Sequence, residues 1–161
     1  MSDVARTLLR HTVATVAYRG GKATRGAPAS FADFKDGPTT RTPVEILAHI
    51  GDLFDWALSM AVGNWKWNNS TPLAWDAEVA RFHATLKAFD DYLATDAPLG
   101  RPVEVLFQGP VADALTHGGQ ITILRRLHGA PMKGESYARA DIAVGRVGPD
   151  QVPADPKYEF D

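Results

Sequence analysis

The feature that most constrains the fold is a regular spacing of large apolar residues in the middle of the chain. They alternate by four and three positions, as Trp75, Val79, Phe82, Leu86, Phe89 and Leu93. This spacing keeps all of them on one side of an α-helix, whereas a half-buried strand would need alternation by two. The sequence therefore predicts a helix from about Leu73 to Thr95 that packs along one seam against its neighbours.

A second predicted helix has the clearest start in the chain. The segment Thr42-Pro43-Val44-Glu45 places a capping hydroxyl at the N-cap, proline at the first helical position and glutamate at the third. An apolar stripe follows and ends before Gly63; its members are Ile46, His49, Ile50, Leu53, Ala57, Met60 and Ala61. His49 is thus expected on the apolar face of this helix.

The N-terminal segment is predicted as a further helix from about Asp3 to Arg19. Its apolar positions, Ala5, Leu9, Val13 and Val16, are spaced by four, four and three, and the pair at residues 20–21 is glycine, which we expect to end the helix. Residues 22–41 then form a loop in which Phe31 and Phe34 are expected to anchor the chain. A loop this long in a compact domain is either functional or partly ordered.

The fourth helix is expected to begin near Pro110 and to continue to Leu124. Gly118 and Gly119 each cost about 1 kcal/mol against alanine inside a helix. The apolar stripe keeps its phase across them, so we favour a continuous helix over one that breaks and restarts at Gln120.

The four predicted helices indicate an all-α four-helix bundle. The chain of 161 residues fits a single domain over residues 1–161, with a long loop between the first two helices and an extended C-terminal tail from about residue 131. Residues 103–107 have strand propensity but no partner run.

Composition excludes several classes of protein. The 17 basic and 19 acidic side chains give a net charge of −2 without any basic run, so neither nucleic-acid nor membrane-surface binding is expected. The longest stretch free of charged residues, residues 114–124, is too short to cross a membrane. The chain has no cysteine, which excludes disulfides and thiolate ligands. The N-terminus lacks the apolar core of a signal peptide, and a cytoplasmic location is expected.

One set of residues has the spacing of a metal site. Asp113 and His117 are four apart, so on one helix they share a face and can bind one ion. His49, from the inward face of another helix, is the third candidate. Two imidazoles and one carboxylate suit an open site for zinc or non-haem iron. The alternatives are a hydrogen-bonded core histidine at 49 and an aspartate at 113 that is favoured by the dipole of a helix N-terminus.

Two neighbouring side chains are candidates for orienting a metal-binding histidine or for binding a ligand. Gln120 lies three residues after His117, and Asp52 lies three after His49. Each could hydrogen-bond an imidazole or a bound ligand. The alternatives are a helix-contact amide for Gln120 and a solvated helix residue for Asp52.

Two segments carry a resemblance to a known family. The segment Thr42–Asp52 (TPVEILAHIGD) resembles the second helix of the DinB/YfiT-like family, and Gly109–Gln120 (GPVADALTHGGQ) resembles the fourth. The resemblance implies an up-down-down-up four-helix bundle, usually a homodimer, that holds a divalent ion with three histidines. Carried over by position, these ligands are His49, Asp113 and His117. Asp113 departs from the commoner histidine, and its carboxylate favours harder ions within the set zinc, nickel, manganese and iron.

The same resemblance implies a metal-dependent enzyme of the thiol S-transferase or hydrolase type that acts on a small-molecule substrate or a thiol. The alternative is a protein of the stress response that holds a metal or small molecule without turnover. A third hypothesis is a structural bundle that has lost the metal. The sequence places no general base beside the proposed ion.

Overall fold

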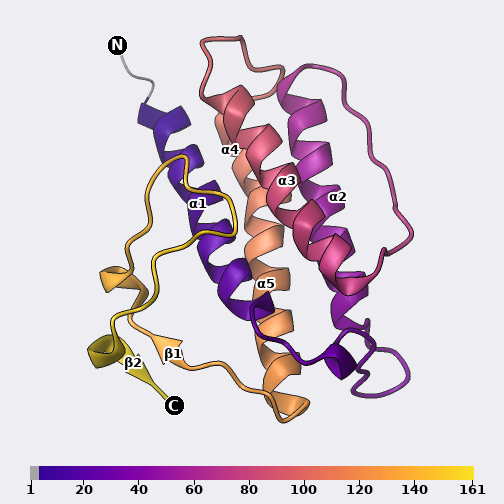
Figure 1. Ribbon diagram of the computed structural model, residues 1–161. Helices are drawn as coiled ribbons and strands as arrows, with labels where there is room; N and C mark the ends of the chain where they lie inside the picture. Colours follow the sequence, from indigo (N-terminus) through magenta and orange to yellow (C-terminus); the bar gives the residue numbers. More distant parts are fainter. Residues whose placement is uncertain (1–3) are drawn as a thin grey trace.

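The computed structural model describes residues 4–161 and is dominated by helices. The long ones are α1 (Val4–Thr24), α2 (Pro43–Ala61), α3 (Trp75–Leu93) and α5 (Ala112–Leu127). They lie side by side, with α1 and α2 each in contact with both α3 and α5 (Figure 1). A buried apolar core fills the space between them. The predicted all-α class is confirmed.

The direction of the helices follows from the lengths of their connections. In Figure 1, α1 runs downward and α2 returns upward after the loop of residues 25–42. Residues 62–74 then run back along the outside of the molecule, so α3 also runs upward, parallel to α2. The short α4 (Val103–Leu106) begins at the top, and α5 runs downward.

Both strongly patterned helices form as predicted. The Thr42 side chain accepts a hydrogen bond from the Glu45 backbone N–H (3.3 Å), and the Glu45 carboxylate accepts one from the Thr42 N–H (2.7 Å). This capping box satisfies backbone groups that the first turn of α2 leaves unpaired. On α3 the predicted seam is the buried face, with Phe82 and Phe89 fully buried.

The predicted end of α1 is wrong, because the helix continues through both glycines to Thr24. Gly20 permits a close approach of α3 instead. A Cβ at Gly20 would lie 2.5 Å from the Phe82 ring. The helix gives way to a loop at Gly26, which has a φ of +64°. The predicted start at Asp3 lies outside the described residues.

The start of the fourth helical segment also differs from the prediction. Residues 103–107, which have strand propensity, are helical: α4 leads into η2, a π-helical turn (Phe107–Val111), and then into α5. Pro110 lacks a backbone N–H and disrupts regular α-helical bonding, and the wider turn accommodates it. The predicted continuity across Gly118 and Gly119 is confirmed.

Short elements complete the chain. The loop before α2 contains the 3₁₀ turn η1 (Ala29–Phe31), and both predicted anchors pack on the core, with Phe31 fully buried. The tail has the 3₁₀ turns η3 (Tyr137–Arg139) and η4 (Pro156–Tyr158) and an antiparallel pair, β1 (Gly134–Glu135) with β2 (Glu159–Phe160).

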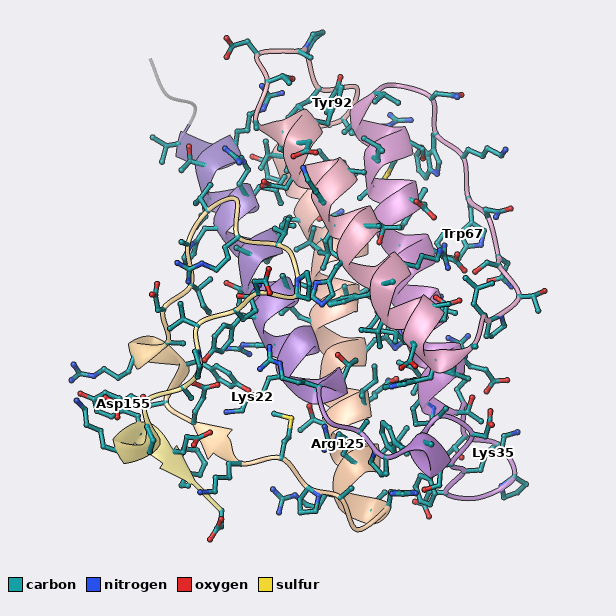
Figure 2. The ribbon with its side chains drawn as sticks, in the orientation of Figure 1. Lys22, Lys35, Trp67, Tyr92, Arg125 and Asp155 are labelled. Carbon is teal, nitrogen blue, oxygen red and sulfur yellow. The ribbon has the colours of Figure 1, made fainter. Side chains whose placement is uncertain are left out.

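Polar contacts attach the tail and the helix ends to one another. Lys22 of α1 forms ion pairs with Glu135 and Glu159, at 2.9 and 3.3 Å. Buried Arg125 of α5 donates hydrogen bonds to the backbone carbonyls of Ala23 and Arg25, at 3.1 and 2.8 Å. Figure 2 labels Lys22 beside the tail and Arg125 near the lower end of α5. Within residues 4–161, none of the helices combines the length and the apolar character that a membrane crossing requires.

Candidate metal centre

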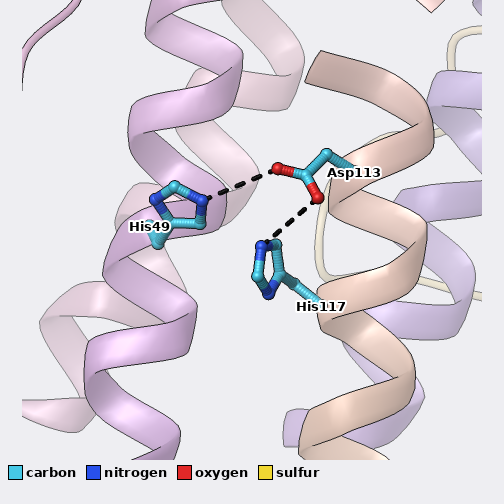
Figure 3. Close-up of side chains that lie close together, drawn as sticks. All are labelled: His49, Asp113 and His117. Carbon is cyan, nitrogen blue, oxygen red and sulfur yellow. Dashed lines mark ion pairs between the residues drawn. The ribbon is translucent and has the colours of Figure 1, made fainter. Parts of the chain in front are cut away.

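The structure brings the three predicted ligands together between α2 and α5 (Figure 3). His49 comes from α2, and Asp113 and His117 come from successive turns of α5. The Nε2 atom of His49 lies 3.7 Å from Oδ2 of Asp113, and that of His117 lies 3.4 Å from Oδ1. One ligand atom from each residue lies within 4.8 Å of the other two. Both imidazoles therefore face the same carboxylate.

These separations fit a metal ion. Zinc bonds of about 2.0–2.2 Å to nitrogen and oxygen place neighbouring tetrahedral ligand atoms about 3.3–3.6 Å apart. The two nitrogen–oxygen distances, 3.4 and 3.7 Å, lie at or close to that range, but they reach different oxygens of Asp113. With one ligand atom taken from each residue, all separations lie within 4.8 Å, so the side chains would move slightly closer around an ion. Imidazole and carboxylate are also common ligands of first-row divalent ions. The His49–Asp113–His117 group could hold such an ion and would leave further coordination positions open.

Gln120 lies where a residue that orients a ligand would be expected. Its Oε1 atom is 2.9 Å from Nδ1 of His117. Because an amide oxygen only accepts hydrogen bonds, this contact is satisfied when Nδ1 carries the imidazole proton. The unprotonated Nε2 then faces Asp113, as ligation requires.

Asp52 has different partners from those expected. Its carboxylate accepts hydrogen bonds from the backbone N–H and hydroxyl of Ser70, at 3.0 and 2.8 Å, and pairs with Arg81 at 2.6 Å. Asp52 therefore links α2 to α3 and to the loop of residues 62–74. It forms no hydrogen bond with the His49 ring. Its negative charge still favours protonation of His49.

The surroundings of His49 favour its neutral form. The side chain is 19% exposed, and its ring packs edge-on against His117 and Trp67, with centroids 4.7 and 5.7 Å apart. Burial lowers the pKa of His49, as do the charges of His117 and Arg41, while Asp113 acts in the opposite direction. A histidine must be neutral to bind a metal ion, so the effects that lower the pKa of His49 favour metal binding near neutral pH.

The alternative explanation of Asp113, a helix N-terminus, does not fit the backbone. Val111, which precedes α5, has helical angles (φ −74°, ψ −45°), and the helical path begins as far back as Val103. The helix dipole acts mainly on the first turn, so it gives Asp113 little stabilisation here. Its side chain, 47% exposed, faces two histidines instead.

A cavity of about 570 Å³ adjoins the two histidines. Gln120 also lines it, together with apolar side chains from α2 and α5. The loop before α2 contributes Asp36, Thr40 and Arg41, which sequence reasoning did not single out. The only sequence feature that pointed to these three residues was the unusual length of the loop, which is typical of functional or partly ordered segments.

Comparisons with known proteins identify no relative of this chain: no family model, curated protein or solved structure matches it.

Proposed function

We propose that the protein is a metal-dependent enzyme of the DinB/YfiT-like type, in which His49, Asp113 and His117 hold a divalent ion. The observation that carries this proposal is the convergence of two Nε2 atoms and one carboxylate beside a cavity. The parallel directions of α2 and α3, with α1 and α5 opposed to them, support an up-down-down-up bundle.

The proposed chemistry is thiol transfer or hydrolysis on a small molecule. When bound, a divalent ion supplies Lewis acidity, which lowers the pKa of a thiol or water beside it and favours the nucleophilic form at neutral pH. His49 and His117 contribute neutral donors, and Asp113 offsets part of the ion's charge. Gln120 keeps the His117 ring in the ligating tautomer. The candidate ions remain zinc, nickel, manganese and iron.

The decisive experiment is elemental analysis of protein purified without a His-tag or chelator. We expect about one divalent ion per chain in the wild type and its loss in His49→Ala and His117→Ala. His11→Ala, which removes an exposed histidine of α1, is the matched control. Full metal content in both site variants would refute the metal centre.

Turnover is tested separately. Thiol-conjugation and ester-hydrolysis assays are run on the ion-loaded protein, the chelated protein and His117→Ala. Activity that requires both the ion and His117 supports an enzyme. A stoichiometrically bound ion without activity on either substrate class favours the alternative, a non-catalytic metal holder.

A further inference from the structure

We propose that the cavity beside the metal centre binds small monocarboxylates with an apolar chain, and that Arg41 holds the carboxylate. This inference rests on the proposed function for the role of the adjoining ion, but it concerns the substrate class and a residue outside the ligand set.

Arg41 forms no close ion pair with the described residues, although its charge helps to lower the pKa of Glu45. It lines the cavity that contains His49 and His117, and no carboxylate of residues 4–161 lies within 4.0 Å of it. The adjacent acid, Glu45, is already engaged, because its carboxylate accepts hydrogen bonds from the Thr42 N–H and hydroxyl.

Two other arginines of the structure bind carboxylates. Arg10 binds Asp90 through two hydrogen bonds of 2.9 Å, and Arg81 binds Asp52 and Asp55. Arg41 differs from both in offering its donors at the wall of a cavity. A planar guanidinium with unused donors matches the two oxygens of a carboxylate.

Four aliphatic side chains line another part of the cavity wall, which favours a ligand with a hydrocarbon chain. Ile46 of α2 and Ile123, Leu124 and Leu127 of α5 line it. Ile123 and Leu127 are 61% and 53% exposed, so these large side chains remain available to a ligand. The volume, about 570 Å³, lies within the range typical of small-molecule sites.

The charges at the cavity favour one negative charge on the ligand. Arg41 and a divalent ion are opposed by Asp36 on the same wall and by Asp113 at the ion, which leaves a net excess of one positive charge for the ligand to balance. A phosphate dianion is therefore disfavoured relative to a carboxylate. A cationic ligand would be repelled by both Arg41 and the bound ion.

The test compares hexanoate with hexanamide, hexylamine and acetate by two-dimensional amide NMR titration of the zinc-loaded and the chelated protein. We expect hexanoate to shift signals of Ile123 and Leu127. Hexanamide should bind at least about tenfold more weakly because it lacks the charge. Acetate should also bind at least about tenfold more weakly because it lacks the chain. Hexylamine should not bind.

The variant Arg41→Gln should weaken hexanoate binding about 10- to 100-fold in both forms of the protein. Arg126→Gln is the matched control, since Arg126 is an exposed arginine of α5 that does not line the cavity. Equal melting temperatures of the two variants would show that the effect is on binding.

Unchanged hexanoate affinity in Arg41→Gln would overturn the inference, as would equal binding of hexanamide. Binding that requires zinc but not Arg41 would also overturn it, because the ion would then hold the carboxylate. The proposed function fails independently: a protein that binds no metal yet binds hexanoate through Arg41 retains the carboxylate site. A metal-loaded protein that does not bind hexanoate refutes this inference alone.

Discussion

Replacing Asp113 by asparagine keeps the size and polarity of the side chain and removes its charge. The structure predicts that this change acts on metal binding far more than on folding. Asp113 faces the Nε2 atoms of His49 and His117 at 3.7 and 3.4 Å. It is also 47% exposed, so its contribution to the metal-free fold is weakened by solvent.

The expected cost without metal is small. A pair between a half-exposed carboxylate and two histidines contributes little to stability, because solvent screens the attraction. Asp113 lies inside a continuous helical path, so loss of a favourable dipole interaction adds little. We therefore expect Asp113→Asn to change the free energy of unfolding of chelated protein by less than about 0.5 kcal/mol.

The expected cost with zinc is several times larger. At a zinc concentration of about 100 Kd the wild type gains about 2.7 kcal/mol. Loss of a residue that only orients a ligand weakens binding by about 10- to 100-fold, so loss of a charged ligand should reach at least about 100-fold. The variant would then gain only about 0.4 kcal/mol at the same zinc concentration. At about 2–4 °C per kcal/mol, the difference corresponds to a melting temperature about 5–9 °C lower than that of zinc-loaded wild type.

Differential scanning calorimetry with and without zinc measures both quantities. Asp91→Asn is the matched control, because it removes an exposed helical carboxylate that pairs with Lys87 four residues away. If Asp113→Asn keeps the full zinc-dependent rise in melting temperature, Asp113 is not a ligand. If the chelated variant is already strongly destabilised, its role is structural.

Three further predictions concern the surroundings of the site and the core. Gln120→Leu should lower zinc affinity about 10-fold or more without loss of helicity, as measured by competition with a zinc indicator and by circular dichroism. Burial lowers the pKa of His83 below its ordinary 6.5. The part of the unfolding free energy that depends on neutral His83 should therefore be fully present above pH 6.5 and should decrease as the pH falls below 6.5. Urea midpoints at about pH 7.5 and 5 should show this decrease, and it should be smaller in His83→Gln. Gly20→Ala should overlap the Phe82 ring at a cost of about 1–3 kcal/mol, which offsets or exceeds the roughly 1 kcal/mol that alanine gains over glycine inside a helix. Urea unfolding should therefore show no gain in stability, and a gain of about 1 kcal/mol would contradict the close packing.

The homodimer implied by the family resemblance also stays a prediction. Light scattering at micromolar concentration should give twice the chain mass of 17.4 kDa. A monomeric mass would contradict it.

The parts of the fold that the sequence predicted are those determined by nearby residues. The start of α2 depends on a reciprocal contact between Thr42 and Glu45, three positions apart. The buried face of α3 follows from the spacing of its own side chains. The spacing of Asp113 and His117 likewise places both on one face of α5, and the helical stripe of α2 predicted that His49 points inward.

What the sequence could not predict depends on contacts between distant segments. Gly20 and Gly21 suggest a helix end when only their neighbours are considered, but the helix continues through both, and Gly20 makes room for the Phe82 ring of α3. The cavity wall at Asp36 and Arg41 comes from an irregular loop, whose course no periodicity predicts. Asp52 was predicted to hydrogen-bond an imidazole or a ligand, or else to lie in solvent, but it is buried and its partners, Ser70 and Arg81, lie on other segments.

Those partners give the candidate centre a support that the ligands alone do not provide. Arg81 of α3 binds Asp52 of α2, and Ser70 binds both of them. These bonds attach the loop of residues 62–74 to the side of α2 that carries His49. Trp67 of that loop lies on the outer side of the molecule in Figure 2, and its ring contacts His49. The His49 imidazole is therefore packed between Trp67 and His117 before any ion binds, which reduces the conformational entropy that ligation must remove.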